Sequence, residues 1–394
     1  RFATAVGGIA HRPSRRGEVA SLCHRLPHLR PQSDAKRDRS RNSGNRSPFM
    51  QPFFSRRSLL RLALAQAGAV TLAGCSSAIG ALDSSSTPAA TGNSSPTGAR
   101  GGPVVYAGTT RAPVNGASER PWFGSARSGG TRAVAVRFDP PPEGFFDRIG
   151  ATLTGDWHIN AVEPLGNNDP VAALTLAAAG RDVLIYVHGY NQSFEQAAID
   201  AAELSRAIGF SGATVGFSWP SKEGLLDYGY DRESALWSRD AFQDLLEALV
   251  RNAMIGRVHI VAHSMGTLLT LETLRQLWAV SVSPDVAARF GAIVLASPDI
   301  DVDLFATSVR RIGPLAKHIT VISSVNDRAL AVSSRLAGGV SRVGAADRAV
   351  LEPLGVRIAD ASEYGWGIIR HDLFLSNKDV RGVIKRAVER KTWD

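Results

Sequence analysis

Cysteine is almost absent from this sequence. The 394 residues include two cysteines, Cys23 and Cys75, so residues 76–394 contain none. A disulfide framework needs paired cysteines, and structural zinc sites commonly use several cysteine ligands. The sequence therefore excludes a disulfide scaffold and a cysteine-based metal site from most of the chain.

The sequence is also short of long hydrophobic runs. The apolar run over 62–74 would extend about 20 Å as a helix, at 1.5 Å per residue. The hydrocarbon core of a bilayer is about 30 Å thick. This run is therefore too short to span a membrane comfortably, and it suits instead the hydrophobic part of an export signal.

An excess of positive charge is missing from most of the chain, although the formal net charge is +9. Residues 1–49 hold 11 Lys and Arg against 3 acidic residues, and residues 50–75 add three arginines. The part after Cys75 is consequently close to neutral. Nucleic-acid-binding domains carry a basic patch on their folded surface. We therefore expect no nucleic-acid partner.

Residues 1–49 lack any hydrophobic period and are rich in Arg, Ser, Pro and Asn. Such a composition cannot bury enough apolar surface to offset the entropy of ordering. We expect a disordered basic segment here. Because Met50 directly precedes an export signal, we favour the interpretation that translation starts at Met50. A genuine disordered basic tail is the alternative.

Residues 50–75 have the parts of a secretory signal. The adjacent Arg56 and Arg57 precede the apolar run, and small residues end it. The paired arginines resemble a twin-arginine signal. A core helix is the alternative, but glycines interrupt the segment and no amphipathic stripe is present. We therefore expect an exported protein.

The signal ends on Leu72-Ala73-Gly74-Cys75, which resembles a bacterial lipobox. This resemblance implies lipidation of Cys75 and anchoring to the cell envelope, on the periplasmic face of a membrane. Residues 76–102 are rich in Ser, Thr, Gly, Pro and Ala and are typical of a flexible tether.

From residue 103 onward, short apolar runs alternate with amphipathic stretches. Strands that are apolar on both faces and separated by helices indicate a parallel sheet with covered faces. We expect strands at 103–109, 132–138, 182–187, 213–218, 257–262, 291–296, 318–323 and 355–359. We expect helices near 193–209, 233–254, 265–280, 301–312 and 377–390. The sequence thus predicts one α/β domain over 103–394.

A nucleophile motif joins the expected strand 257–262 to the expected helix 265–280. The joint contains Ser264 between Ala262-His263 and Met265-Gly266. A serine on a sharp strand-to-helix turn presents its hydroxyl clear of the backbone, and small residues flank it because the chain passes close to itself. Ala262 stands where the G-x-S-x-G motif has its first glycine. In this context the motif indicates an α/β-hydrolase fold with Ser264 as nucleophile.

A catalytic acid and a histidine are expected further along the chain, in the order Ser, acid, His. Asp327 follows the second expected strand after Ser264, and His371 follows the third. These residues are the expected orienting acid and general base. Asp299 and Asp301, one strand earlier, are the alternative acids.

Two backbone N–H groups are expected to stabilise the oxyanion. One belongs to Met265, directly after the serine. The other belongs to Tyr190, in the loop His188-Gly189-Tyr190 that follows the strand 182–187. The alternative is that this His-Gly pair is merely a turn at the end of a strand. His263, inside the motif, is expected to pack beside the site rather than to act as the base.

Six segments resemble those of a bacterial α/β-hydrolase family of unknown function. They are 187–191 (VHGYN), 217–221 (FSWPS), 230–232 (YDR), 262–266 (AHSMG), 296–299 (ASPD) and 327–330 (DRAL). The likeness runs from about residue 104 to the end of the chain. It implies the fold and a Ser–Asp–His triad, and it supplies no substrate. Members often have glycine before the catalytic histidine, where this chain has Arg370.

The sequence predicts a serine hydrolase that cleaves an ester or related acyl bond through an acyl-enzyme. No cofactor and no metal ion are implied, and the expected substrate is a small-molecule or lipid ester. Acyl transfer by the same triad is one alternative, and a non-catalytic binding or scaffolding lipoprotein is another. Four aromatic residues either line an acyl site or pack in the core: Trp219, Tyr228, Tyr230 and Trp366.

Overall fold

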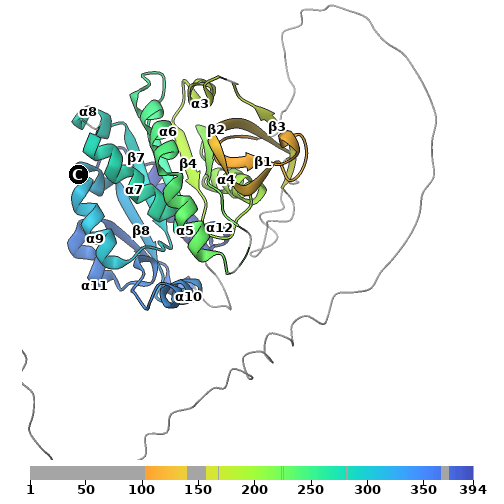
Figure 1. Cartoon of the computed structure of the whole chain (residues 1–394). Coiled ribbons are helices and arrows are strands. Elements are labelled where there is room, and N and C mark those ends of the chain that lie inside the picture. The colour runs from red at the N-terminus through yellow and green to blue at the C-terminus, as the bar shows by residue number, and fades with distance from the viewer. Residues whose placement is uncertain are drawn as a thin grey trace, which may run out of the picture. The chain divides into compact units, whose positions relative to one another are not determined.

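The computed structural model describes residues 103–139, 157–166, 168–222, 224, 226–280, 283–364 and 372–393 (Figure 1). The predictions for 1–49, 50–75 and 76–102, including lipidation of Cys75, lie outside these ranges. Within them, no helix has both the length and the apolar character needed to cross a membrane.

The described residues form a nine-stranded sheet in the order β3-β2-β1-β5-β4-β6-β7-β8-β9. The pairings of β2 with β1 and β3 are antiparallel, and every other pairing is parallel. The strands are β1 (Val104–Pro113), β2 (Phe123–Asp139), β3 (His158–Pro164), β4 (Val183–Val187), β5 (Ala213–Ser218), β6 (Val258–His263), β7 (Phe290–Ala296), β8 (Ile319–Ser323) and β9 (Arg357–Asp360).

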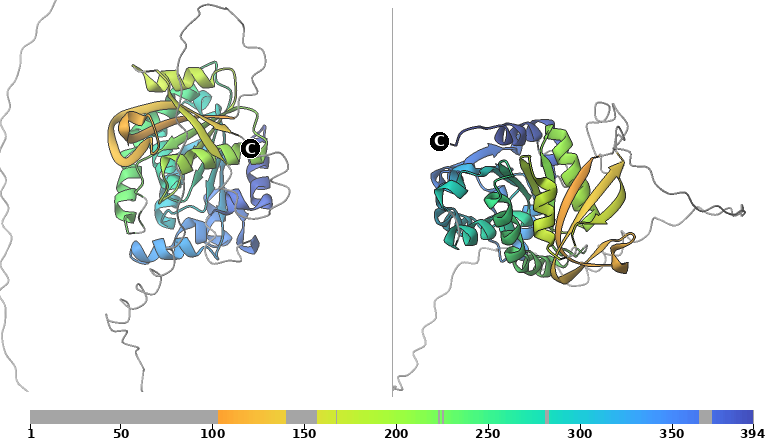
Figure 2. Two further views of the ribbon diagram at one scale, coloured as in Figure 1. Left: turned by 90° about the vertical axis from the view of Figure 1, so that its right-hand side faces the viewer. Right: turned by 90° about the horizontal axis from the view of Figure 1, so that it is seen from above.

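Helices cover both faces of the sheet (Figure 2). One face packs against α3 (Pro170–Ala178), α5 (Tyr228–Trp237), α6 (Arg239–Arg251), α7 (Met265–Val280) and α9 (Val302–Arg311). The other face packs against α4 (Phe194–Ile208), α12 (Leu373–Ser376) and α13 (Lys378–Val388). The remaining helices are α8 (Pro284–Ala287), α10 (Arg328–Leu336), α11 (Arg348–Leu351), η1 (Asn115–Ala117), η2 (Gly313–His318), η3 (Val343–Ala345), η4 (Glu352–Leu354) and η5 (Ser362–Tyr364). The predicted α/β architecture is confirmed.

The central strand β4 shows why its sequence has no polar alternation. Val183, Ile185 and Val187 belong to the hydrophobic cluster on the α6–α7 side. Leu184 and Tyr186 belong to the cluster on the α4 side. Because both faces of a parallel sheet are covered, every position along the strand is apolar.

The predicted helix over 233–254 was wrong, because the structure has two helices there, α5 and α6. They meet at Ser238, whose hydroxyl donates to the Ser234 carbonyl at 2.8 Å and lies 2.8 Å from the Thr110 hydroxyl. A serine side chain that bonds to a nearby backbone carbonyl competes with regular helix geometry. The sequence prediction also lacked β3, α3 and α10.

The strand order reverses around β4. The chain passes from β4 to its neighbour β5 on one side, and then to β6 on the other side. In open α/β sheets, ligands bind at the carboxyl edge of such a reversal. The loops that follow β4 and β6 are therefore where a functional site is expected, and they carry Gly189 and Ser264 respectively.

Candidate active site

Ser264 lies in a strained turn between β6 and α7. Its φ of 50° is in the left-handed region, which non-glycine residues seldom adopt. Its N–H donates to the Ala296 carbonyl at 3.0 Å. Its carbonyl accepts from the N–H groups of Thr267 at 3.1 Å and Asp299 at 3.3 Å. The turn is thus held by the end of β7 as well as by its own helix.

Two glycines allow the loop after β4 to lie directly against this turn. A methyl group at Gly189 would lie 2.9 Å from Cβ of Ser264 and 2.9 Å from Nδ1 of His263. A methyl group at Gly266 would lie 2.3 Å from the His188 carbonyl oxygen. All three distances are too short for a real side chain. The structure therefore brings the predicted oxyanion loop to Ser264.

The two predicted oxyanion donors come from these two segments. Met265 is the first residue of α7, and the first N–H groups of a helix have no acceptor within the helix. Tyr190 directly follows Gly189. Its hydroxyl donates to the Gly224 carbonyl at 2.8 Å, and its ring meets the edge of Tyr228 at 5.6 Å. The side chain of Tyr190 is therefore tied to the loop after β5 and to α5.

A buried arginine that the sequence analysis did not single out holds the same loop. Arg111, on β1, is 1% exposed. Its guanidinium donates to the Gln192 carbonyl at 2.6 Å, the Ser221 carbonyl at 3.1 Å and the Ser218 hydroxyl at 2.9 Å. A buried charge is tolerated where hydrogen bonds surround it. Arg111 therefore ties the loops after β4 and β5 to β1.

His188 stabilises the loop after β4 and does not have the properties of a general base. Burial and the nearby charge of Arg111 lower the pKa of His188 to about 3, so its ring is neutral. Nδ1 donates to the Gly189 carbonyl at 2.8 Å, and Nε2 accepts from the Trp219 N–H at 3.1 Å. The ring stacks on Trp219 with centroids 4.7 Å apart. His188 thus orients the peptide that precedes Tyr190.

Asp231 also stabilises the loop after β4. It is fully buried and accepts from the Asn191 N–H at 3.2 Å, the Lys222 N–H at 2.7 Å and the Ser221 hydroxyl. Burial raises the pKa of Asp231, and these donors act in the opposite direction. The resemblance had marked this residue without giving it a role, and the structure shows that it joins the loops after β4 and β5.

The predicted acid Asp327 lies in the loop after β8. It is 7% exposed, and its Oδ1 accepts from the N–H groups of Ala329 at 3.0 Å and Leu330 at 3.1 Å, so it caps α10. Because β6, β7 and β8 are parallel neighbours, Asp327 leaves the same edge of the sheet as Ser264. His371 lies outside the described residues. The complete triad therefore stays a prediction.

The alternative acids have structural partners of their own. Asp299 is 2% exposed, lies 3.0 Å from Nε of the equally buried Arg342, and accepts from the hydroxyls of Ser333 at 2.7 Å and Tyr228 at 3.0 Å. Asp301 caps α9 by accepting from the Leu304 N–H at 2.9 Å. The buried ion pair argues against Asp299 as the acid, whereas Asp301 caps a helix as Asp327 does, so the choice of Asp327 stays a prediction.

The remaining histidines of interest pack within the domain. The ring of His263 contacts that of Phe374 on α12, with centroids 4.6 Å apart. His259 accepts from the Ala292 N–H at 3.0 Å, and burial lowers its pKa to about 4. His318 hydrogen-bonds the Gly291 carbonyl at 2.9 Å, and burial lowers its pKa too. Each therefore has a structural role.

The aromatic residues proposed for an acyl site also have defined partners. Trp219 is fully buried under His188. The Tyr228 hydroxyl donates to Asp299, and the Tyr230 hydroxyl donates to the Ser125 carbonyl at 2.9 Å. Trp366 lies outside the described residues. Core packing therefore accounts for Trp219 better than acyl binding does.

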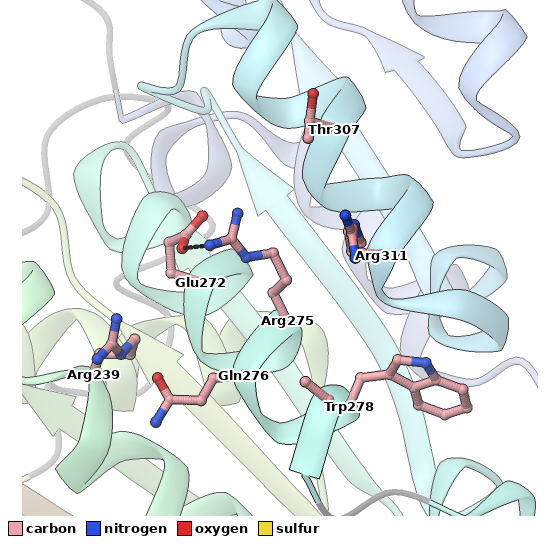
Figure 3. A pocket seen from close by; sticks show the side chains of 8 residues that line it. Arg239, Glu272, Arg275, Gln276, Trp278, Thr307 and Arg311 are labelled. Atoms are coloured by element: carbon pink, nitrogen blue, oxygen red, sulfur yellow. Dashed lines mark ion pairs between the residues drawn. The ribbon is translucent and has the colours of Figure 1, made fainter. Parts of the chain in front are cut away.

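A hollow of about 780 Å³ lies elsewhere, along the second half of α7 (Figure 3). Three arginines line it, and two of them are paired, Arg275 with Glu272 at 3.0 Å and Arg239 with Asp240 at 3.0 Å. The third, Arg311, ends α9. Since α7 begins beside Ser264, this hollow is remote from the predicted nucleophile. The described residues contain no cluster of side chains able to hold a metal ion.

A family model described as an alpha/beta hydrolase of unknown function (DUF900) matches residues 170–387, more than half of the chain. The chain belongs to this family. The match covers the loop after β4, the Ser264 turn after β6 and the loop that holds Asp327. The predicted family and fold are therefore confirmed, whereas the individual site residues stay predictions.

Individual similar proteins add little evidence about the activity of this chain. An uncharacterized protein of Nostoc sp. is 38% identical over 65 residues, which is 16% of this chain and 17% of that protein. A predicted CIB-like hydrolase from Thermoplasma acidophilum has a TM-score of 0.31 and 14% identity, over 65% of this chain and 93% of that one. The esterase LipW from Mycobacterium marinum has a TM-score of 0.34 and 11% identity, over 72% and 81%. Scores this low carry no argument about activity.

Proposed function

We propose that this α/β hydrolase cleaves an ester or a related acyl bond through an acyl-enzyme formed on Ser264. The observation that carries the proposal is the left-handed backbone of Ser264, at 50°, with Gly189 of the neighbouring loop packed against it. Backbone strain of this kind persists where the surroundings enforce it, and it clusters at functional sites. A nucleophilic serine between two segments that supply backbone N–H groups suits acyl chemistry.

In the proposed mechanism, His371 removes the proton from the Ser264 hydroxyl while Asp327 orients the imidazole. The serine oxygen attacks the carbonyl carbon, and the N–H groups of Met265 and Tyr190 stabilise the negative oxygen of the tetrahedral intermediate. His371 then donates its proton to the leaving group, and the acyl-enzyme forms. A water molecule, deprotonated by His371, releases the acid and restores the serine.

The location and the substrate class are part of this proposal and have sequence support only. The twin-arginine-like signal and the lipobox-like end at Cys75 support an exported protein anchored to the envelope by its lipid. An enzyme held at a membrane suits a lipid ester or a small ester released near that membrane. Acyl transfer uses the same machinery and differs only in whether an acceptor alcohol outcompetes water.

Labelling with a fluorophosphonate probe tests the nucleophile. We expect the wild type to be labelled and Ser264→Ala to lose labelling. Ser297→Ala is the matched control, because Ser297 also has a left-handed backbone, at 45°, and is 7% exposed. It should keep its labelling. Circular dichroism checks that each variant is folded.

Either of two results would refute the hydrolase proposal: a folded wild type that stays unlabelled, or a Ser264→Ala variant that is still labelled. The first result would favour the non-catalytic lipoprotein. If labelling behaves as expected, p-nitrophenyl esters of short and long chains measure the acyl preference. Added alcohol acceptors then distinguish hydrolysis from acyl transfer by the product formed.

A further inference from the structure

Exposed aliphatic side chains gather on α10, next to the predicted catalytic acid. Val332 is 57% exposed and Leu336 58% exposed, and they are one helical turn apart on the same side. Val325, in the loop that leads into the helix, is 55% exposed. These three exposed aliphatic side chains make this segment a candidate contact surface.

Two arginines share this side of α10. Arg328 is one turn before Val332, and Arg335 is three residues after it. Both are exposed, and α10 contains no acidic residue. In the part of the chain that the structure describes, no hydrogen bond or ion pair involves either guanidinium. We call Val325, Arg328, Val332, Arg335 and Leu336 the α10 surface.

The opposite side of α10 is fixed to the domain. Leu330 is 1% exposed, and the buried Ser333 hydroxyl donates to Asp299 at 2.7 Å. Asp327 caps the first turn. The helix is thus anchored at the carboxyl edge of the sheet, the edge that also carries Ser264. In Figure 1 it lies near one end of α5, and α3 lies at the far end of the domain.

We propose that the α10 surface docks the domain on an anionic lipid surface, so that the catalytic edge faces the membrane. Aliphatic side chains enter the region between head groups and acyl chains, while arginines keep their guanidinium groups at the lipid phosphates. The absence of acidic residues from α10 suits a negatively charged surface. Docking itself does not depend on the proposed function. Its consequence, that the substrate is a lipid ester presented by the membrane, rests on that function.

The charge argument selects the lipid over two other occupants. A second copy of this chain, packed on the same surface about a two-fold axis, would bring the arginines of both copies together. Coverage of the aliphatic residues alone by another part of the same chain would give no counter-charge to the guanidinium groups, which have no partner among the described residues. An anionic lipid surface accommodates both kinds of side chain at once.

Vesicle sedimentation tests the proposal. The full chain carries Cys75→Ala in every sample, so that no attached lipid contributes. The basic residues 1–75 are identical in the parent chain and in every variant, so a difference between them reports the substituted side chains. Vesicles of phosphatidylcholine alone are compared with vesicles that also contain phosphatidylglycerol. We expect binding to the anionic vesicles, weakened by salt. Replacing both arginines (Arg328→Gln with Arg335→Gln) should weaken it about 25-fold, from about fivefold for each charge.

An aliphatic variant and two matched controls complete the design. Val332→Ser with Leu336→Ser should weaken binding at least about 10-fold, because two buried aliphatic contacts are lost. Leu176→Ser removes a side chain that is 77% exposed on α3, at the opposite end of the domain. Arg310→Gln with Arg311→Gln removes two charges from the end of α9, which leads into the start of β8. Both controls should stay within about twofold of the parent chain.

Several outcomes would overturn the docking proposal. One is that the parent chain does not bind the anionic vesicles, and another is that the controls weaken binding as much as the α10 variants. A third is a lower unfolding temperature of the aliphatic variant with unchanged vesicle binding, which would mean that the chain itself covers the surface. A dimer that this variant dissociates would identify a second copy as the occupant.

Fluorophosphonate labelling without vesicles separates this proposal from the proposed function. We expect the α10 variants to label at the rate of the parent chain, because the substituted side chains are exposed whereas Ser264 and Asp327 are buried. Loss of labelling in the parent chain would refute the hydrolase proposal and leave the vesicle result standing. Loss of vesicle binding with normal labelling would refute docking alone.

Discussion

Replacing Asp299 with asparagine should unfold the protein far more readily and leave its chemistry intact. Asp299 and Arg342 are 2% and 3% exposed, and their charged atoms lie 3.0 Å apart. The asparagine side chain would keep the volume but leave the guanidinium without its counter-charge. Removing one partner of a buried ion pair typically costs 3–5 kcal/mol, or about 4 kcal/mol here. Arg342 also donates to the Tyr228 hydroxyl at 3.0 Å and to the Ser333 carbonyl at 3.3 Å. Both acceptors are neutral, so these hydrogen bonds offset little of the lost attraction between the charges.

A loss of about 4 kcal/mol is a large part of the free energy of unfolding, which is typically about 5–15 kcal/mol. It corresponds to a melting temperature lower by roughly 10 °C, at about 2–4 °C per kcal/mol for domains of this size or somewhat smaller. Urea unfolding followed by circular dichroism measures the free energy directly. Fluorophosphonate labelling at low temperature, where Asp299→Asn is still folded, measures the chemistry. We expect labelling of Asp299→Asn near the wild-type rate.

Asp327→Asn is the matched comparison. It weakens the cap of α10, a loss of about 1 kcal/mol. If Asp327 orients the base, the labelling rate should nevertheless fall by a factor on the order of 10³ to 10⁴. The opposite pattern, in which Asp299→Asn is as stable as the wild type but unlabelled, would make Asp299 the acid. The double change Asp299→Leu with Arg342→Met should be less destabilising than Asp299→Asn, because no charge is left buried.

Two further predictions concern the oxyanion loop and the pH dependence of stability. Gly189→Ala should lower the labelling rate about 100-fold and the free energy of unfolding by about 1–3 kcal/mol. The added methyl group would lie 2.9 Å from Cβ of Ser264 and displace the Tyr190 N–H. A variant that labels at the wild-type rate would contradict this prediction. Burial raises the pKa of Asp200 to about 6 and that of Glu203 to about 7. The folded protein therefore holds protons that the unfolded chain releases, so the free energy of unfolding should fall as pH rises from about 4 to 7. In Glu203→Gln the fall measured by urea unfolding between pH 5 and pH 8 should be smaller, and an equal fall would refute the assignment.

The sequence by itself determined the sheet except for β3, the family and the position of the serine turn. These are local properties: apolar runs define the strands, and Ala262, Ser264 and Gly266 define a tight joint within five residues. The order of elements along the chain then places Asp327 and Ser264 at one edge, because parallel strands all end on the same side. The 188–190 loop was predicted to supply an oxyanion donor because it lies one strand-helix-strand-helix unit before the serine strand.

Only the tertiary structure decided what holds the site in shape. Arg111 reaches Gln192, which is 81 residues away along the chain, and Tyr228 reaches Asp299, which is 71 residues away. An arginine or an aspartate in the sequence does not show whether its partner is water or a buried group, and burial decides which. The structure therefore assigned Asp299 to an ion pair with Arg342, divided one predicted helix at Ser238, and exposed the arginines and aliphatic residues of α10. Each of these outcomes depends on which distant segments pack together, and local sequence patterns do not contain that information.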